Sequence, residues 1–579
     1  MSISRYIDSI PFIESMKGYR LGFFKKDLIA GLTIGLIAVP LSMALAINSG
    51  VAPQYGLYTA IVAGFFIAIC GGSRFNISGP TAAFVIILQP ITNQYGLVGL
   101  LTASFLAGII LLLMGLLRLG RMIFFVPQSV VTGFSMGIAV VIALTQLPDF
   151  FGAIPTVSGT DFISRLQGIA QVITQASWAD VFLGCTTLAG MLIFPKIFKG
   201  FPPHLFVLLL AVALGALLSY FGLEFRTIYS VFSYTLDGKE YAGIPAILPA
   251  LSLPWTDVTG SSFLSLKMIQ DLLPLSFTIA LLGAIESLLC AVVADGMTDT
   301  HHKPNAELVG QGIGNIIAPF FGGFAATGAL ARTATSIRAG AKTPLAAIIH
   351  SLFVLMVLLL FTPFLNRLPM ASLAALLLVV AWGMADFRYF KGIFPMMPRQ
   401  DKLVLFTCLS LTIIFDMVIA VMIGMLLACA LFMRRVAKLT TIDLLSDEET
   451  VGRQRVNIDK SFALEYRITG PFFFGVARKA IDSMARLSTI GGSTKVVIIY
   501  LQSVPFIDLS GLMAFKLMIE HIQSKGMVVI LSGLNNDVKK TLGKAGLSPK
   551  KNAGIYWANT VEEAAEKAME CYVMFTMIK

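Results

Sequence analysis

Charged side chains are scarce in this chain of 579 residues. Only 13% of the residues are Asp, Glu, Lys or Arg, whereas 56% are hydrophobic. A typical soluble domain is about a quarter charged. The shortage is uneven, because residues 28–433 hold 33 charged side chains and the much shorter segment 434–579 holds 34. The composition excludes a soluble enzyme and a disordered scaffold, and it predicts a membrane part followed by an ordinary soluble domain.

Cysteine is also rare. The six cysteines form no CxxC pair, and five of them lie in apolar runs, where cysteine is usually a small core residue. This excludes a secreted disulfide framework and predicts no metal site. The first apolar run begins at Leu28 and has no small-residue cleavage site after it, so we expect no signal peptide. We also expect no organic cofactor.

The net charge of +11 comes with no nucleic-acid-binding motif, so we predict no nucleic-acid partner. In membrane proteins Lys and Arg collect on the cytoplasmic side. Four of them lie between residues 17 and 26, before the first apolar run, and three lie between 434 and 438, after the last. Both ends are therefore predicted to be cytoplasmic, with residues 1–27 as an N-terminal segment and an even number of crossings.

Long charge-free runs supply the crossings. A span needs about 20 apolar residues in a helix, because backbone groups must pair internally in lipid. Turn residues and charges delimit twelve candidate spans: 28–47, 54–71, 79–91, 97–117, 124–147, 178–196, 203–222, 272–294, 307–322, 329–341, 343–362 and 368–385. The run 403–433 is too long for one span and is broken at Phe415-Asp416, so we expect a hairpin of two short helices there. The sequence thus predicts an α-helical polytopic membrane protein with 14 spans.

The spans divide into two groups of seven around an exterior loop. The groups cover about residues 28–222 and 272–433, and because seven is odd they form inverted repeats. The third segment of each group is a poor span, since residues 76–84 and 325–333 place glycine and small residues before a short helix. Pro80 suits the first turn of such a helix. Interrupted spans at matching places in inverted repeats are typical of a transporter's binding site.

Two helix N-termini that face each other would make an anion site. Each would carry about half a positive charge and free N–H groups. The alternative is that both segments are ordinary glycine-rich packing helices. Their matching positions favour the functional interpretation.

Two charged residues fall beside these interruptions. Glu286 lies halfway along a span, where a lone carboxylate is costly and generally functional. Arg332 lies one turn into the second short helix, close to the predicted anion position. The alternatives are a structural acid held by backbone groups and an arginine that extends to the membrane interface. We predict that Glu286 takes up the coupling proton and that Arg332 binds the anion.

Several motifs resemble those of the SulP family of anion transporters, which includes the sulfate permeases and prestin. They are residues 27–33 (DLIAGLT), 49–58 (SGVAPQYGLY), 72–74 with 78–81 (GSR and SGPT) and 329–333 (ALART). The resemblance covers nearly the whole chain. Within the family, residues 283–298 and 307–323 are most similar to bacterial members that carry C4-dicarboxylates.

The resemblance implies two intertwined inverted repeats, divided into a core and a gate domain, in a chain that is usually a homodimer. It places the substrate site between the third and tenth spans, with the first and eighth lining it. Carried over to this sequence, the substrate-binding residues are Leu41, Ala44, Leu45, Thr81, Ala329, Leu330, Ala331 and Arg332, with Glu286 on the eighth span. Many family members have Gln where this chain has Leu41, and the missing amide donor disfavours sulfate.

Residues 434–579 are predicted to form a linker and a cytoplasmic α/β domain. Residues 495–501 and 527–531 are typical of buried strands, and the loop between them leads into a helix of about ten residues. This pattern resembles a STAS domain, in which the loop can bind a nucleotide or carry a phosphate on Ser510. The alternative is that Asp508 or Ser510 caps the helix. We expect a cytosolic regulatory protein or a nucleotide as the partner of this domain.

Together these features predict a secondary active transporter, not an enzyme, in the inner membrane of a bacterium. Its expected partners are the lipid bilayer and a small anion, and the main expectation is proton-coupled uptake of C4-dicarboxylates such as succinate, fumarate and aspartate. Two helix ends and Arg332 contribute about +2, and protonation of Glu286 would leave that field intact for a dianion. Sodium is an alternative coupling ion. Sulfate or bicarbonate transport, or an anion channel, are the alternative functions.

Overall fold

The computed structural model divides the chain into two compact units, Met1–Met425 and Leu426–Lys579. The boundary falls inside the last span that the sequence predicts. The structure describes residues 11–16, 19–121, 126–154, 162–197, 203–236, 239–256, 265–415, 417–444, 462–476, 494–549 and 552–577.

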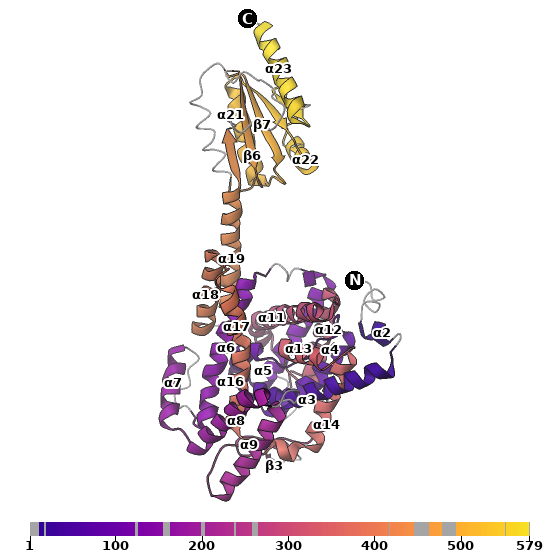
Figure 1. The fold of residues 1–579 in the computed structure, drawn as a ribbon, viewed down its shortest axis with the longest axis vertical. Helices are drawn as coiled ribbons and strands as arrows, with labels where there is room; N and C mark the ends of the chain where they lie inside the picture. The colour runs from indigo at the N-terminus through magenta and orange to yellow at the C-terminus, as the bar shows by residue number, and fades with distance from the viewer. Residues whose placement is uncertain are drawn as a thin grey trace. The chain divides into compact units, whose positions relative to one another are not determined.

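The first unit is built from helices (Figure 1). In chain order they are α2 (Pro11–Met16), α3 (Leu21–Asn48), α4 (Pro53–Cys70), α5 (Ala82–Leu116), α6 (Gln128–Phe151), α7 (Phe162–Thr174), α8 (Trp178–Ile197), α9 (Pro203–Tyr220), α10 (Ile228–Val231), α11 (Leu266–Thr298), α12 (Pro304–Ile317), α13 (Leu330–Arg338), α14 (Leu345–Leu360), α15 (Thr362–Leu365), α16 (Met370–Ala385), α17 (Phe387–Ile393) and α18 (Arg399–Ile414), followed by α19 (Met417–Leu439). Within the described residues, eight helices are long and apolar enough to cross a membrane, and two shorter ones are also apolar. α5 consists of two helices joined at Gly96, where a φ of 64° interrupts the helix. The predicted α-helical membrane fold is confirmed.

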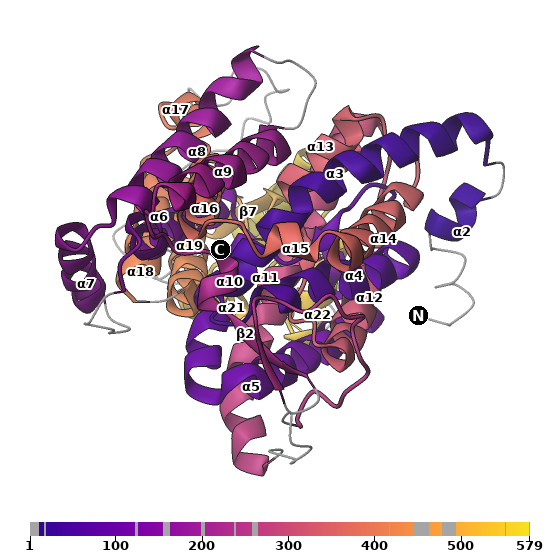
Figure 2. The ribbon, with the colours of Figure 1, turned by 90° about the horizontal axis from the view of Figure 1, so that it is seen from below.

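The helices of this unit pack in two main sets. One set contains α3, α4, α5, α11, α12, α13 and α14, and the other contains α6, α8, α9, α16 and α18. Figure 2 shows α6, α8, α9 and α16 on one side of the unit and α3, α4, α13 and α14 on the other. Each set therefore draws helices from both halves of the chain, as intertwined repeats require.

The first long helix, α3, begins at Leu21, earlier than the sequence predicts. The extension is fixed at Asp27, which is fully buried. The Asp27 carboxylate accepts from the backbone N–H groups of Lys342 (2.6 Å) and Thr343 (3.1 Å), and from the hydroxyls of Thr343 (2.6 Å) and Tyr19 (3.2 Å). Burial and the neighbouring Asp27 raise the pKa of Tyr19 to about 12, so this donor stays protonated. Asp27 thus ties the start of α3 to the loop before α14.

Other elements also differ from the sequence predictions. α11 begins at Leu266 and not at 272, and α7 is a helix that the sequence does not predict. α18 and α19 are two helices where a hairpin of short helices is predicted, but α19 has 23 residues. The predicted turn residue Asp416 lies outside the described residues. The loop that the sequence predicts to be exterior contains an antiparallel hairpin of β2 (Ser233–Leu236) and β3 (Lys239–Ala242).

The second unit is a five-stranded sheet with helices on both faces (Figure 1). The strand order is β5–β6–β7–β8–β9, and every neighbouring pair is parallel except β5 with β6. One hydrophobic layer lies under α21 and the other under α23. The elements are β5 (Thr441–Leu444), β6 (Ala463–Thr469), β7 (Val496–Ser503), α21 (Leu509–Ser524), β8 (Val528–Ser532), α22 (Asn536–Lys544), β9 (Ile555–Ala558) and α23 (Val561–Met577). The predicted α/β fold of the tail is confirmed.

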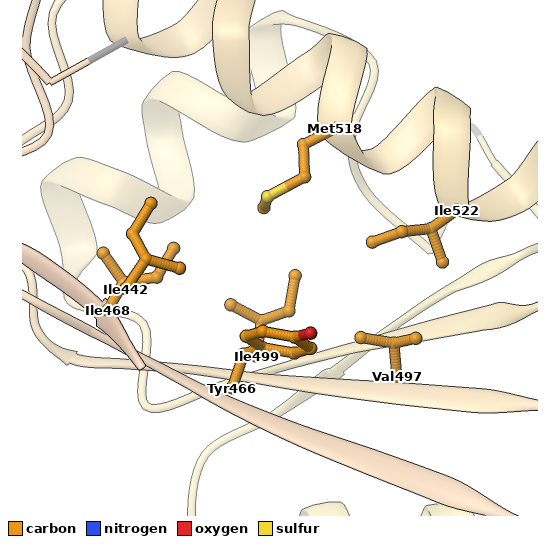
Figure 3. A pocket seen from close by; sticks show the side chains of 7 residues that line it. All are labelled: Ile442, Tyr466, Ile468, Val497, Ile499, Met518 and Ile522. Carbon is orange, nitrogen blue, oxygen red and sulfur yellow. The ribbon is translucent and has the colours of Figure 1, made fainter. Parts of the chain in front are cut away.

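A small apolar cavity lies between α21 and the sheet (Figure 3). Met518 and Ile522 from α21 face side chains of the strands, which are Ile442, Tyr466, Ile468, Val497 and Ile499. Its free volume is close to the minimum that one water molecule needs. An apolar space of this size stays dry, so it is a packing gap and not a ligand site.

Asp508 caps helix α21, which is one of the two capping residues that the sequence suggested. The carboxylate accepts from the backbone N–H groups of Gly511 (2.7 Å) and Phe474 (3.1 Å). We expect Asp508→Ala to destabilise this unit by about 1 kcal/mol, because these two donors lose their acceptor. Hydrogen–deuterium exchange of the full-length protein should then be faster in α21. Asp508→Asn keeps an acceptor for one of the two donors and should give a smaller change, and unchanged exchange in the alanine variant would show that the cap is dispensable.

Candidate functional site

The interruptions at residues 76–84 and 325–333 meet in the structure. β1 (Ser78–Gly79) and β4 (Thr327–Gly328) pair with each other as antiparallel strands. α5 follows β1 and α13 follows β4. The pairing therefore brings the N-terminal ends of two helices from opposite halves of the chain to one place.

Neither of these helix ends has a side-chain cap among the described residues. Thr81 precedes α5 and Ala329 precedes α13, both in extended backbone. The first N–H groups of a helix have no partner within the helix, and the aligned peptide dipoles place about half a positive charge there. Both ends are thus left able to donate to a bound anion.

Arg332 connects the two short helices. It projects from α13, and its Nη2 donates to the carbonyl of Pro80 at 2.5 Å, next to the start of α5. The residue is only 3% exposed, yet its Nε and Nη1 have no hydrogen-bond partner among the described residues. A Cβ on Gly79 would lie 2.8 Å from Nη1, so glycine allows the guanidinium to approach the strand pair. Arg332 therefore places a buried charge with unused donors at the paired helix ends.

Glu286 on α11 belongs to the same cluster. Its carboxylate interacts with the Thr81 hydroxyl and with the charge of Arg332. Its Oε2 is buried and has no hydrogen-bond partner among the residues that the structure describes. The structure thus brings together one acid, one base and one hydroxyl from three different elements.

The other predicted binding residues differ in how exposed they are. On α3, Leu41 is half-buried, whereas Ala44 and Leu45 are each 2% exposed and lie in the packed interior. At the start of α13, Leu330 is 50% exposed and Ala331 is exposed as well. The start of α13 is therefore open, while two of the three positions on α3 serve packing in this state.

A second buried carboxylate, which the sequence analysis missed, lies behind the site. Glu307 at the start of α12 is 1% exposed. It accepts from the backbone N–H groups of Gly72 (2.8 Å) and Ser73 (3.0 Å) and from the amides of Asn76 (2.7 Å) and Gln311 (3.1 Å). It forms no ion pair within the described ranges. Four donors therefore occupy both oxygens of Glu307, whereas Glu286 has one oxygen without a hydrogen-bond partner among the described residues.

Polar side chains extend this network to both strands of the pair. The Gln311 amide donates to the Ser78 hydroxyl at 3.0 Å. On the other strand, the hydroxyls of Ser287 and Thr327 lie 2.6 Å apart, and Gly328 N–H donates to Ser287 Oγ at 3.1 Å. The two breaks are therefore held by α11 and α12 together, so the helix ends are positioned by side chains and not by backbone pairing alone.

A signal for this network was present in the sequence. Glu307, Gln311 and Asn315 are spaced four residues apart, so they lie on one face of α12. Asn315 uses its amide at that face, where it accepts from Ala326 N–H at 2.7 Å and donates to the Ala326 carbonyl at 2.9 Å. A polar face on an apolar helix indicates buried hydrogen bonding, but glycine-rich packing explained the helix equally well.

We expect Glu307→Gln to destabilise the protein by roughly 2–4 kcal/mol, because the new NH2 group would face a donor and leave it unpaired. Thermal unfolding of the purified full-length protein in nanodiscs measures this. Glu14→Gln is the matched control, since Glu14 is 53% exposed and its ion pair with Arg74 should matter little. Equal unfolding temperatures for the two variants would contradict the role of Glu307.

The structure offers little for a metal ion. Across the part of the chain that it describes, no three His, Cys, Asp or Glu side chains gather in a way that could hold one.

Ser510, the predicted regulatory residue, lies in the second unit and is exposed in the first turn of α21.

The comparison with known proteins identifies both units. Residues 24–410 match the sulfate permease family, and residues 453–564 match the STAS domain. The putative sulfate transporter YvdB of Bacillus subtilis is 37% identical, over 93% of this chain and 97% of that protein. The bicarbonate transporter BicA of Picosynechococcus is 28% identical, over 90% of each chain.

Solved structures share the fold. The inward-facing murine anion transporter Slc26a9 has a TM-score of 0.82 at 15% identity, and the alignment covers 98% of this chain and 95% of that one. The transmembrane domain of a cyanobacterial BicA has a TM-score of 0.59 at 27% identity, covering 71% of this chain and 98% of that one. The chain therefore belongs to the sulfate permease family, as an anion transporter with a C-terminal STAS domain.

Proposed function

We propose that the chain carries sulfate across the membrane together with a proton bound at Glu286. The observation behind this proposal is Arg332, a buried guanidinium with two unpaired N–H groups at two uncapped helix ends. A buried charge without partners is strongly unfavourable. An oxyanion that accepts from Arg332 and from the first N–H groups of α5 and α13 satisfies all of these donors at once.

The charges of the site match the proposed cargo. The two helix ends contribute about +1 together, and Arg332 contributes +1. With Glu286 protonated the site carries about +2, which balances sulfate. With Glu286 ionised it carries about +1, because the carboxylate cancels one charge. Binding of a dianion and protonation of Glu286 therefore favour each other, which is the requirement for symport.

The distribution of charge at the site favours a compact anion over a C4-dicarboxylate. Arg332 is the only Lys or Arg in the described residues that is fully buried, and both helix ends converge beside it. A C4-dicarboxylate has two separated charges and would need a second cationic group. The relatives named above are sulfate and bicarbonate transporters, and none supports the C4-dicarboxylate specificity that the sequence analysis expected. Leu41 has no amide, so sulfate has fewer donors here than in family members with Gln at this position. The positive charge of the site stays the same.

Bicarbonate is the second candidate. The likeness to BicA supports it, because that protein shares 27% identity over its whole transmembrane domain. A monovalent anion would suit the site with Glu286 ionised. Bicarbonate transport would then need no proton, and sodium could serve as the coupling ion.

Uptake of labelled sulfate into proteoliposomes tests the proposal. We expect saturable uptake that an inward proton gradient accelerates, with inhibition by bicarbonate and weak inhibition by a tenfold excess of succinate or fumarate. Stronger inhibition by succinate than by unlabelled sulfate would restore the dicarboxylate hypothesis. Flux without saturation or counterflow would indicate an anion channel.

For the second unit we propose a regulatory role that acts through the start of α21. Ser510 is exposed there, and a phosphate at a helix N-terminus is electrostatically favourable. Asp508 already caps the helix, so capping does not require Ser510. Mass spectrometry of protein from growing cells should detect phosphoserine at this position, and its consistent absence would refute the modification.

We further propose that the protein is a homodimer in a bacterial plasma membrane with both termini in the cytoplasm. The basic residues that flank the predicted spans support this orientation. Cysteine accessibility at engineered terminal sites in whole cells tests it, and native mass spectrometry of the purified protein tests the dimer. Labelling of either terminus from outside the cell would contradict the orientation.

A further inference from the structure

Thr333 follows Arg332 on α13 and has a buried hydroxyl that the proposed transport cycle leaves without a role. The residue is 1% exposed. Its Oγ1 accepts from the backbone N–H of Ile77 at 2.9 Å, and the two residues are 256 positions apart in the chain. Ile77 immediately precedes β1, so the bond runs from a side chain in one interrupted segment to the backbone of the other. Thr333 therefore joins the two halves of the chain at the site.

α13 binds Ile77 on both sides of its peptide backbone. The carbonyl of Ile77 accepts from the N–H of Ala329 at 2.9 Å, and its N–H donates to Thr333. Ala329 precedes α13, and Thr333 lies one turn further along that helix. Two bonds fix the orientation of the strand as well as its position, whereas the Ala329 bond alone would leave it free to rotate.

The Thr333 hydroxyl also contacts the helix that carries the acid. The thiol of Cys290 on α11 donates to the same Oγ1 at 3.1 Å. Cys290 comes four residues after Glu286, so both lie on one face of α11. A single hydroxyl on the helix of Arg332 thus meets the strand that leads into α5 and the helix of Glu286.

The bond matters because Ile77 is itself buried, at 1% exposed. A buried N–H that loses its acceptor costs more free energy than an ordinary hydrogen bond contributes. Without the Thr333 hydroxyl, the strand would relieve this cost by moving toward water, which is nearest at the open start of α13, where Leu330 is 50% exposed. That movement shifts the end of α5 relative to α13, and anion binding would have to reverse it.

We infer that Thr333 is a positioning residue of the anion site, whose hydroxyl holds the end of α5 where one anion can accept from both helix ends and from Arg332. It acts through Ile77 and not through contact with the anion. This inference rests on the proposed function and names a residue that determines the affinity of the same site.

Three variants test the role of the hydroxyl in sulfate uptake. Thr333→Val keeps the side-chain shape but removes the acceptor, so the half-saturating sulfate concentration should rise about tenfold, with little change in maximal rate per folded protein. Thr333→Ser restores the acceptor and should return that concentration to within about threefold of wild type. Thr335→Val is the matched control, because Thr335 is partly exposed on the same helix and donates only within it, to the Ala331 carbonyl at 2.7 Å. It should bind sulfate as wild type does.

A second measurement does not depend on the anion. Hydrogen–deuterium exchange of the full-length protein in nanodiscs without sulfate should be faster at residues 76–84 in Thr333→Val than in wild type, Thr333→Ser or Thr335→Val. Wild-type affinity in Thr333→Val overturns the inference, whether or not exchange or unfolding temperature changes, and so does a Thr333→Ser variant as weak as Thr333→Val. Failure of wild type to bind sulfate overturns the proposed function, and the exchange result still decides whether Thr333 holds the strand.

Discussion

Replacing Arg332 with alanine is expected to raise the half-saturating sulfate concentration by at least about 100-fold, which corresponds to roughly 3 kcal/mol. Arg332 is 3% exposed and is the one buried Lys or Arg side chain in the part of the chain that the structure describes. A charged hydrogen bond in a desolvated site is much stronger than one in water. Binding of labelled sulfate to the purified protein measures the loss directly.

Two further variants make this result specific. Arg338→Ala removes an exposed arginine from the last turn of the same helix and should leave affinity unchanged. Arg332→Lys keeps the charge but loses the planar fork that reaches both Pro80 and an anion, so it should recover only part of the affinity. An Arg332→Ala protein that binds sulfate as wild type does would remove Arg332 from the site.

Replacing Glu286 with glutamine is expected to abolish proton-driven accumulation of sulfate while leaving binding intact. In wild type, sulfate should bind more weakly as pH rises, because loss of the Glu286 proton reduces the positive field of the site. Glutamine resembles the protonated acid at every pH, so the variant should keep high affinity at alkaline pH, about tenfold above wild type. Uptake with and without an imposed pH gradient, together with binding between pH 6 and 9, measures both effects.

Glu307→Gln is the comparison variant for this experiment, and we expect it to behave differently. The same substitution there removes an acceptor from a carboxylate that holds four donors, so it should reduce stability and not coupling. Retention of a full response to the proton gradient in Glu286→Gln would show that another group carries the proton.

The two broken spans could be predicted from the sequence because their signal is local. Glycine, proline and small residues at 76–84 and 325–333 disfavour a continuous helix, and each is third in its group of spans. Glu286 and Arg332 could be found because charge is so rare in the membrane part. The pattern of buried strands and the family resemblance together also predicted the α/β fold of the second unit.

The residues that hold the site could not be derived in the same way. Glu307 acts through Gly72 and Asn76, which lie more than 200 residues away in the chain. Asp27 looked like the last charge before a span, but it is buried because it binds a loop 315 residues further on. Periodicity reports which face of a helix is apolar, not which distant backbone groups require an acceptor.

Substrate specificity is the property that the sequence predicts least well. The two runs that suggested C4-dicarboxylates, residues 283–298 and 307–323, form parts of α11 and α12. Most of their side chains pack between helices or hold the strand pair, and Glu286 is the member that interacts with Arg332. Similarity in such segments reflects the scaffold more than the anion, so it does not determine which anion binds.

The most direct test of the central claim is to locate the anion. Selenate has the shape and charge of sulfate, and selenium scatters anomalously, so crystals grown with selenate at acidic pH can place it. We predict one anomalous peak within hydrogen-bonding distance of Arg332 and of the first N–H groups of α5 and α13, which disappears in Arg332→Ala. A saturable peak elsewhere in the first unit, or none at the paired helix ends under conditions in which sulfate is transported, would contradict the account.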